Sequence, residues 1–243
     1  MTTAQDIAAP VSMVFLYYDN PKMLQVQIDC WNKYAGVLTV LPEVLLIDDG
    51  SPKTSAAAIV REIKCALPLK VFRIKEDIAW NFAGARNLGC VHAAGWIYVS
   101  DIDTLLPAED ARKFFETRPL DPQSYYMPKR VWLPDLREAS PASVNLLFHK
   151  EKYLDIGGYD EDYAGHYGRE ETDYYRRIGR AATKVFREDV VVRAVPPMVV
   201  PDARTITHRP RDKTRNAEVF ARKEAAGFVK PVNPLRFSWE RVL

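Results

Sequence analysis

The stretch GARNLGCVHAAGWIYVSDID, from Gly84 to Asp103, decides the fold. Its first part is typical of a helix, and its last part contains a short strand-like run, Trp96–Ser100, that ends on Asp101 and Asp103. Both carboxylates are expected on one face at the rim of a sheet, because positions i and i+2 of a strand share a face. Such a pair suits a divalent cation and the phosphates that it neutralises. Acids at strand ends are also common turn and cap residues, so the pattern needs support from the rest of the chain.

The segments before this stretch alternate between strand and helix patterns. Continuous apolar runs predict parallel strands covered on both faces, whereas apolar residues at helical spacing predict the helices between them. The alternation implies an α/β fold with a mostly parallel, Rossmann-like sheet flanked by helices, in which ligands bind beyond the carboxyl ends of the strands. The expected strands are Val11–Tyr17, Glu43–Ile47, Lys70–Ile74 and Trp96–Ser100, and the expected helices span about 21–34, 55–67 and 80–94.

After Asp103 the pattern changes, and a mixed antiparallel portion is expected. A helix over Ala108–Thr117 precedes a proline-rich stretch, Pro119–Pro141, for which we expect loops and short antiparallel strands. The other expected elements are a strand at Val144–His149, a helical turn at Glu151–Asp155, a glycine turn at 157–158, and helices over Glu170–Gly179 and about 214–226.

Length and composition limit the possible classes of protein but do not indicate a binding partner. The 243 residues suit one large domain, and 34 basic residues against 32 acidic ones give no excess of charge, so no nucleic-acid partner is expected. Cys30, Cys65 and Cys90 form no CxxC pair, which argues against a disulfide framework or a zinc site and fits a reducing compartment. No apolar run approaches the roughly 20 residues of a membrane helix. We therefore expect no transmembrane segment and a cytoplasmic protein, either free or peripheral to a membrane.

Two further groups of acids are candidates for the same site. Asp48 and Asp49 follow the second expected strand, so they lie at the same edge of the sheet as the DID acids. Downstream, Glu170, Glu171 and Asp173 crowd the first turn of an expected helix. Clustered carboxylates raise one another's proton affinity, which suits a general base in a cleft. The alternative is an acidic first turn that only complements the helix dipole.

A histidine and several aromatic residues lie near these acids in the sequence. His208, in a basic segment, could complete a metal shell begun by carboxylates, although a lone histidine among basic residues is often only exposed. His166 adjoins the acidic cluster and is a candidate contact to an acceptor. Aromatic rings at strand ends or in loops can stack on a base or a sugar, or serve packing alone. The rings in question are Tyr17, Tyr18, Trp80, Tyr163 and Tyr167.

Four motifs in this order resemble those of inverting glycosyltransferases with the GT-A fold. They are IDDGS at Ile47–Ser51, GARNLGCVHAAGWIYVSDIDT from Gly84, IGGYDEDYAGHYGREETDYYRRI at Ile156–Ile178, and THRPRDKTRN at Thr207–Asn216. The last two are similar to the C-terminal region of the β-1,4-galactosyltransferases. The resemblance implies a single GT-A domain over 1–243. Its nucleotide-binding half would end at about residue 104, and an acceptor-binding half with a C-terminal arm would follow.

The resemblance also implies roles for residues on the donor side. Asp48 would hydrogen-bond the nucleotide base, Arg86 would lie in the nucleotide pocket, and Asp101 would contact the ribose, or the metal through water. Asp103 would bind Mn²⁺ or Mg²⁺ directly, and His208 matches the metal-binding histidine of the family. The expected sets are Tyr17, Asp48, Asp49, Arg86 and Asp101 for the nucleotide and Asp101, Asp103 and His208 for the metal.

On the acceptor side, Glu171 matches the carboxylate that acts as base, and Glu170 and Tyr167 would lie against the acceptor sugar. Two departures bear on specificity: Thr205 replaces a methionine of the galactosyltransferases, and the base is a glutamate in place of aspartate. The expected sets are Glu170, Glu171 and Asp173 for catalysis and Trp80, His166, Tyr167 and Glu170 for the acceptor.

The expected activity is therefore metal-dependent transfer of a sugar, with inversion, from a nucleotide-diphosphate sugar to a glycan or a lipid-linked glycan. The family indicates a UDP-linked donor. One alternative is a sugar nucleotidyltransferase, but such enzymes usually carry a glycine-rich loop after the first strand, and Phe15–Pro21 has no glycine. Another alternative is a non-catalytic carbohydrate-binding protein, which would be expected to lack acids that this chain retains.

Overall fold

A computed structural model describes residues 10–116, 120–140, 144–205 and 209–243. The strands are β1 (Val11–Tyr17), β2 (Glu43–Asp48), β3 (Leu69–Ile74), β4 (Trp96–Asp101), β5 (Thr104–Leu105), β6 (Ser124–Trp132), β7 (Leu146–His149), β8 (Thr183–Ala194) and β9 (Trp239–Arg241). The helices are α1 (Pro21–Asn32), α2 (Ala56–Glu62), α3 (Phe82–His92), α4 (Ala108–Glu116), α5 (Lys150–Asp155), α6 (Glu170–Ala181) and α7 (Thr214–Ala225), with short 3₁₀ turns η1 (Lys33–Gly36) and η2 (Glu161–Tyr163).

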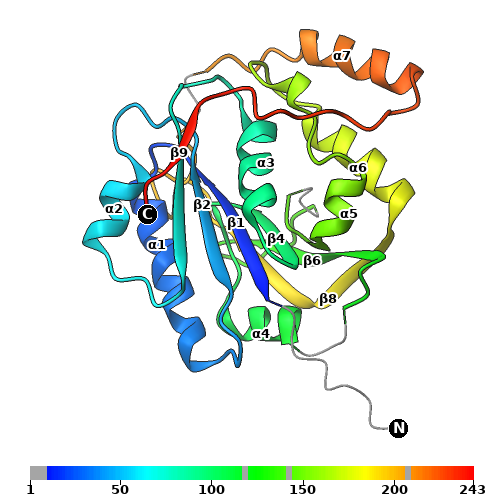
Figure 1. Cartoon of the computed structure of the whole chain (residues 1–243). Coiled ribbons are helices and arrows are strands. Elements are labelled where there is room, and N and C mark those ends of the chain that lie inside the picture. The colour runs from blue at the N-terminus through cyan, green and yellow to red at the C-terminus, as the bar shows by residue number, and fades with distance from the viewer. Residues whose placement is uncertain (1–9, 117–119, 141–143, 206–208) are drawn as a thin grey trace, which may run out of the picture.

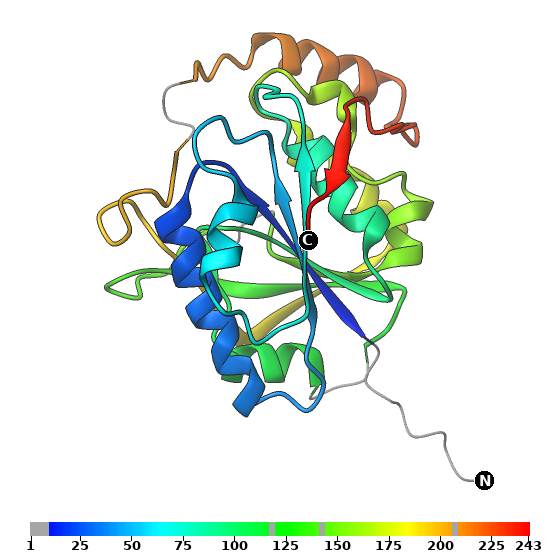
Figure 2. The ribbon, with the colours of Figure 1, turned by 60° about the vertical axis from the view of Figure 1, so that its left-hand side comes forward.

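Within these residues, nine strands form one sheet in the order β5-β8-β6-β7-β4-β1-β2-β3-β9, and helices cover both of its faces (Figures 1 and 2). β4, β1, β2 and β3 are parallel neighbours, as the alternation of strands and helices predicts. The register pairs Tyr17 with Asp48 and Leu16 with Asp101. The carboxyl ends of β1, β2 and β4 therefore meet at one edge, where the sequence places its first two groups of acids.

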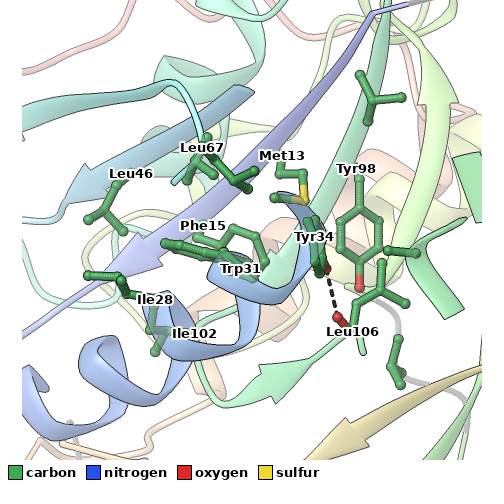
Figure 3. Close-up of a cluster of buried hydrophobic side chains, with 14 of the residues drawn as sticks. Met13, Phe15, Ile28, Trp31, Tyr34, Leu46, Leu67, Tyr98, Ile102 and Leu106 are labelled. Atoms are coloured by element: carbon green, nitrogen blue, oxygen red, sulfur yellow. Dashed lines mark hydrogen bonds between the residues drawn. The ribbon is translucent and has the colours of Figure 1, made fainter. Parts of the chain in front are cut away.

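One face of the sheet packs against α1, α2 and α4. Met13 and Phe15 of β1 point into this layer, and the rings of Phe15 and Trp31 lie 5.1 Å apart (Figure 3). The buried hydroxyl of Tyr34 donates a hydrogen bond of 2.6 Å to the carbonyl of Leu106 (Figure 3). Large side chains such as these each contribute about 1.5–3 kcal/mol by burial, so this layer fixes the sheet on which the site is built.

The other face packs against α3, α5 and α6. Val14 and Leu16, the alternate residues of β1, point into this layer. A Cβ at Gly89 would overlap the side chain of Val14, so this glycine allows α3 to approach β1 closely. On the α6 side, the buried rings of Tyr159 and Tyr174 stack with centroids 4.1 Å apart. These contacts hold α3 and the start of α6 against one edge of the sheet.

The second half of the sheet differs from the prediction for Pro119–Pro141. The expected short antiparallel strands are replaced by the nine-residue β6, which pairs antiparallel with β7 and parallel with β8. Pro128 lies where the β6–β8 register shifts, between Pro128 and Lys129, and a strand tolerates a residue without an N–H at such a point. The sequence analysis did not predict β8, whose charged residues are mostly exposed.

Two other elements differ from expectation. α2 ends at Glu62, five residues before the predicted end, and the hydroxyl of Ser55 caps its start by accepting from the N–H of Ala58. The C-terminal arm does not lie free, because β9 pairs antiparallel with β3 and covers that edge of the sheet. In the described part of the chain, no helix combines the length and the apolar character needed to cross a membrane.

Candidate active site

A cavity of about 620 Å³ opens where β1 and β4 end and α6 begins. This volume is within the roughly 300–1,000 Å³ typical of ligand sites. Charged residues line much of the wall. Among the described residues, the acids are Asp49, Asp101, Asp103, Glu170 and Glu171, and the bases are Arg86, Arg130, Arg169, Arg204, Arg211 and Lys213.

Arg86, from the GARNLG motif on α3, lies in this cavity. One Nη of its guanidinium is 3.0 Å from Oδ1 of Asp101 and 3.3 Å from Oε1 of Glu171. The side chain is 2% exposed and lies between the rings of Phe82 and Tyr159. Its Nε and other Nη have no hydrogen-bond partner among the described residues. Buried donors usually have partners, so these two groups are unsatisfied in this arrangement.

The neighbouring Asn87 holds the second half of the chain against α3. Its amide nitrogen donates to the carbonyl of Tyr159 at 2.8 Å and to a carboxylate oxygen of Glu161 at 3.0 Å. Its amide oxygen accepts the N–H of Tyr159 at 3.0 Å. The motif therefore has two uses: Arg86 reaches the cavity, and Asn87 fixes the segment that leads toward α6. The sequence analysis did not single out Asn87.

Asp101 and Asp103 line the same wall, as predicted. Asp103 is largely buried and pairs with Arg204, whose Nε lies 3.4 Å from Oδ2 of the acid. Burial, followed by the nearby charge of Asp101, raises the pKa of Asp103 to about 6. The described residues contain no cluster of three or more metal-ligating side chains, and His208, the third predicted ligand, lies outside the described residues. Two carboxylates that repel each other are nonetheless a donor set that fits a hard divalent cation.

The acids at the start of α6 separate into two groups. Glu170 and Glu171 line the cavity, whereas the carboxylate of Asp173 pairs with Arg177 at 2.6 Å in the interior. Arg177 in turn donates to the carbonyl of Gly158 at 2.6 Å, so Asp173 supports the glycine turn and lies away from the cavity. The structure therefore does not bring Asp173 to the other two predicted catalytic acids.

Glu170 and Glu171 differ in their surroundings. Glu170 is 7% exposed, and its Oε2 has no hydrogen-bond partner among the described residues. Burial, followed by the charge of Glu171, raises the pKa of Glu170 to about 7, so this carboxyl is partly protonated at neutral pH. The side chain of Glu171 is 30% exposed and pairs with Arg86. Glu171 is therefore the acid with better access to a ligand.

On the donor side, Asp49 takes the place expected of Asp48. Both carboxylate oxygens of Asp48 accept backbone N–H groups at 2.9 Å, from Ser51 and Ala56, and the side chain does not line the cavity. It shapes the loop after β2 and the start of α2. Asp49 does line the cavity and accepts a hydrogen bond of 3.0 Å from the amide of Asn81. Burial raises the pKa of Asp49 to about 7.

The predicted aromatic residues and His166 differ in whether they reach the cavity. Trp80 and Tyr167 line the cavity together, with centroids 4.7 Å apart and rings inclined at 61°. Tyr17 forms part of the wall but is buried and donates its hydroxyl to the carbonyl of Thr54. His166 is exposed and does not line the cavity.

Several residues at the site were not predicted. Arg130 of β6 and Arg204 lie with their guanidinium carbons 4.8 and 5.2 Å from the ring centre of Trp132, and both reach the cavity. Asn216 of α7 lies within hydrogen-bond distance of three carbonyls between residues 163 and 168, so it fixes the loop that carries Tyr167. Basic residues and an asparagine in these positions give no signal in the sequence until the strand and helix that carry them are placed.

Comparison with known proteins identifies the class of enzyme. The family model described as glycosyl transferase family 2 matches residues 35–134. The model described as the N-terminal domain of galactosyltransferase matches residues 130–199. No curated protein matches the chain at a significant level. The two family matches confirm the predicted resemblance and the predicted enzyme class, glycosyltransferase.

Solved structures share the fold at low sequence identity. TarS of S. aureus in complex with UDP-GlcNAc has a TM-score of 0.64 and 14% identity over 86% of this chain and 64% of its own. GalNAc-T7 with UDP, GalNAc and Mn²⁺ has a TM-score of 0.64 and 14% identity over 79% and 44%. The mannosyltransferase PcManGT from Pyrobaculum calidifontis with GDP-Man and Mn²⁺ has a TM-score of 0.57 and 18% identity over 79% and 60%. This chain thus covers less than two thirds of each structure, and the likeness confirms the predicted GT-A fold.

Proposed function

We propose that this protein, whose chain matches two glycosyltransferase family models, transfers a sugar with inversion from a nucleotide-diphosphate sugar to a hydroxyl of a glycan acceptor in a metal-dependent reaction. The observation that carries the proposal is the position of Arg86, which joins Asp101 of the DID stretch to Glu171 of α6 inside one cavity. A donor held at Asp101 would therefore lie within reach of a base on α6.

For the donor we propose a UDP-sugar. Two of the similar structures contain UDP or a UDP-sugar and one contains GDP-Man, so the nucleoside diphosphate is the feature that these ligands share. In this chain, Tyr17 and Asp49 line the part of the cavity beside β1 and would contact the nucleoside. Arg86 lines the same cavity, and its guanidinium would donate to oxygen atoms of the ribose or phosphates.

Asp101 and Asp103 would hold the cation, Mn²⁺ or Mg²⁺. When bound, a divalent cation would offset the negative charge of the departing diphosphate. Two of the similar structures contain Mn²⁺, which supports this choice of metal. Arg204 pairs with Asp103, and both Arg204 and Arg130 line the cavity and would face the phosphates.

For the chemical step, Glu171 would remove the proton from the acceptor hydroxyl. The hydroxyl oxygen would then attack the anomeric carbon from the side opposite the diphosphate, and a single displacement inverts the configuration. Glu170 is better suited to hold the acceptor, because its partly protonated carboxyl can donate a hydrogen bond as well as accept one. Trp80 and Tyr167 offer ring faces or edges against which a sugar can pack.

The experiment that tests this proposal is a thermal-shift screen of UDP- and GDP-sugars with Mn²⁺ or EDTA, followed by a transfer assay with the best donor. At a ligand concentration near 100 times Kd, binding adds about 2.7 kcal/mol of stability, which corresponds to an increase in Tm of roughly 5–10 °C for a chain of this size. We expect this increase for at least one UDP-sugar with Mn²⁺ and its loss in EDTA. Failure of every nucleotide sugar to raise Tm would contradict the proposal.

A further inference from the structure

We propose that the acceptor is an anionic saccharide, whose phosphate or carboxylate group is bound by Arg169, Arg211 and Lys213 at the exposed rim of the cavity. This inference rests on the proposed function, because it specifies the acceptor for the same site.

Among the residues that the structure describes, no acidic side chain forms an ion pair with the three rim cations, Arg169, Arg211 and Lys213. Two other arginines of the cavity are paired: Arg86 with Asp101 and Glu171, and Arg204 with Asp103. Within the described ranges, no carboxylate forms an ion pair with any of the rim cations. The acid between two of them, Asp212, accepts a hydrogen bond of 2.9 Å from the N–H of Thr214. Among the described residues, the positive charge of the rim is therefore not neutralised by an ion pair with an acidic side chain.

Two of the rim cations are held beside the rings proposed to contact the acceptor. The guanidinium carbon of Arg211 lies 5.3 Å from the centre of the Tyr167 ring, and Nζ of Lys213 lies 5.5 Å from it. These distances are typical of cation–π contacts, which limit the positions of both cations. The indole N–H of Trp80 donates to the carbonyl of Pro210 at 3.0 Å and so fixes the backbone just before Arg211. An acidic substituent on a sugar packed against Tyr167 would thus meet both cations.

The third rim cation approaches from the start of α6. Arg169 precedes Glu170 and adopts a left-handed backbone conformation, with φ of 76°. Its guanidinium carbon lies 5.1 Å from the ring centre of Phe220 on α7. Together with Arg211 and Lys213, it places positive charge on both segments that border Tyr167.

The rim cations differ in position from the two arginines that are expected to contact the diphosphate of the donor. Arg130 and Arg204 lie with Asp103 at the end of β4, where the diphosphate and its metal are proposed to bind. The acid beside the rim, Glu170, has a pKa of about 7 and so neutralises only part of the rim charge. A neutral sugar would leave the rim cations partly dehydrated without a counterion, whereas an anionic sugar would supply one.

The test compares matched neutral and anionic sugars on the full chain, with UDP and Mn²⁺ present at saturating concentrations. Glucose, galactose and N-acetylglucosamine are each titrated by calorimetry, and so are their 6-phosphates, the uronic acids of the two hexoses, and inorganic phosphate. We expect at least one anionic sugar to bind at least about tenfold more tightly than its neutral counterpart and than inorganic phosphate. The phosphate and carboxylate arms identify which anion is preferred, and the preference should weaken at high salt.

The double variant Arg211→Gln/Lys213→Gln should lose this preference while its affinity for UDP and Mn²⁺ stays within about twofold of that of the parent. The control variant, Arg61→Gln/Lys64→Gln, removes the same charge from exposed positions in and just after α2 and should leave both properties unchanged. Equal binding of neutral and anionic sugars to the parent would overturn the inference, as would equal binding of inorganic phosphate.

The inference would also be overturned if the double variant lost UDP affinity and kept its preference among sugars, because the cations would then serve the donor. These outcomes differ from failure of the proposed function, in which the parent protein would bind no nucleotide sugar at all.

Discussion

Nη2 of Arg86 on α3 lies 3.3 Å from Oε1 of Glu171 at the start of α6, and both residues line the cavity. The two residues are 85 positions apart in the sequence, and each belongs to a different motif. The ion pair joins α3 to the start of α6, and the same guanidinium also pairs with Asp101. We therefore expect the buried side chain of Arg86 to affect both the stability and the activity of the protein.

We expect Arg86→Met to reduce both properties. The substitution leaves the carboxylates of Asp101 and Glu171 close together without their shared cation, and the loss of a hydrogen bond between charged groups costs about 1.5–3 kcal/mol. Urea unfolding should show this loss of free energy of unfolding, and calorimetry should show loss of UDP binding. Arg61→Met, at an exposed position on α2, is the control and should change neither. Parental stability in Arg86→Met would mean that the ion pair does not support the fold.

The two glutamates at the start of α6 should have separable effects. We expect Glu171→Gln to lower kcat by roughly 10²–10⁴-fold with little change in donor affinity, because it removes the base. Glu170→Gln should instead raise KM for the acceptor, since an amide keeps a donor and an acceptor for hydrogen bonds but changes the geometry. Steady-state kinetics with varied acceptor distinguish the two effects. If Glu170→Gln abolished kcat and Glu171→Gln did not, the two roles would have to be exchanged.

Arg204 should compete with the cation for Asp103. The pair is partly exposed, so the competition is worth about 0.2–1 kcal/mol, and Arg204→Gln should raise Mn²⁺ affinity by about two- to fivefold in the absence of nucleotide. UDP affinity should fall at the same time, because the arginine no longer faces the phosphates. Electron paramagnetic resonance of Mn²⁺ and calorimetry with UDP measure the two quantities. A decrease in Mn²⁺ affinity would show that Arg204 does not act as the counterion.

Asp49 should make the protein less stable as the pH rises. Its pKa is about 7 in the folded protein and near 3.9 in an unfolded chain, so the folded state binds an extra proton between these values. Stability from this group is therefore full below about pH 4 and is lost as the pH rises to 7. Asp49→Asn removes the dependence and should raise the free energy of unfolding at pH 8 by on the order of a few kcal/mol.

Urea unfolding at pH 5 and pH 8 checks this sign. The difference in stability between Asp49→Asn and the parent should be larger at pH 8. A difference that does not change with pH would show that the carboxyl titrates normally. A gain found only at pH 5 would reverse the proposed direction of the pKa shift.

The sequence predicted the parallel half of the fold better than the second half, for a physical reason. β1, β2 and β4 are buried on both faces, so each appears as a continuous apolar run followed by acids. β6 and β8 have no such run, because Pro128, Lys129 and Arg130 interrupt β6, and β8 is partly exposed and contains five charged residues. Pro128 also argues against a strand, because proline has no N–H to donate. In the structure it lies at a shift in the β6–β8 register, where the strand tolerates it.

The site residues likewise include some that the sequence predicts and some whose positions only the folded structure shows. Asp101 and Glu171 are 70 positions apart in the sequence, which predicts both for one cavity only through the resemblance to a family, whereas the structure joins them through Arg86. Asp48 and Asp49 are adjacent and equally acidic, so the sequence does not distinguish them. In the structure, the carboxylate of Asp48 accepts backbone N–H groups of the loop after β2 and of the start of α2, which leaves Asp49 to line the cavity. Contacts of this kind arise only when the chain is folded.

Calorimetric titration of a UDP-sugar with Mn²⁺ into three proteins tests the central claim most directly. We expect the parent and Glu171→Gln to bind with similar affinity and Asp103→Asn to bind at least about tenfold more weakly. Only the parent should then turn the donor over. Equal binding to all three proteins would contradict the account, and so would full turnover by Glu171→Gln.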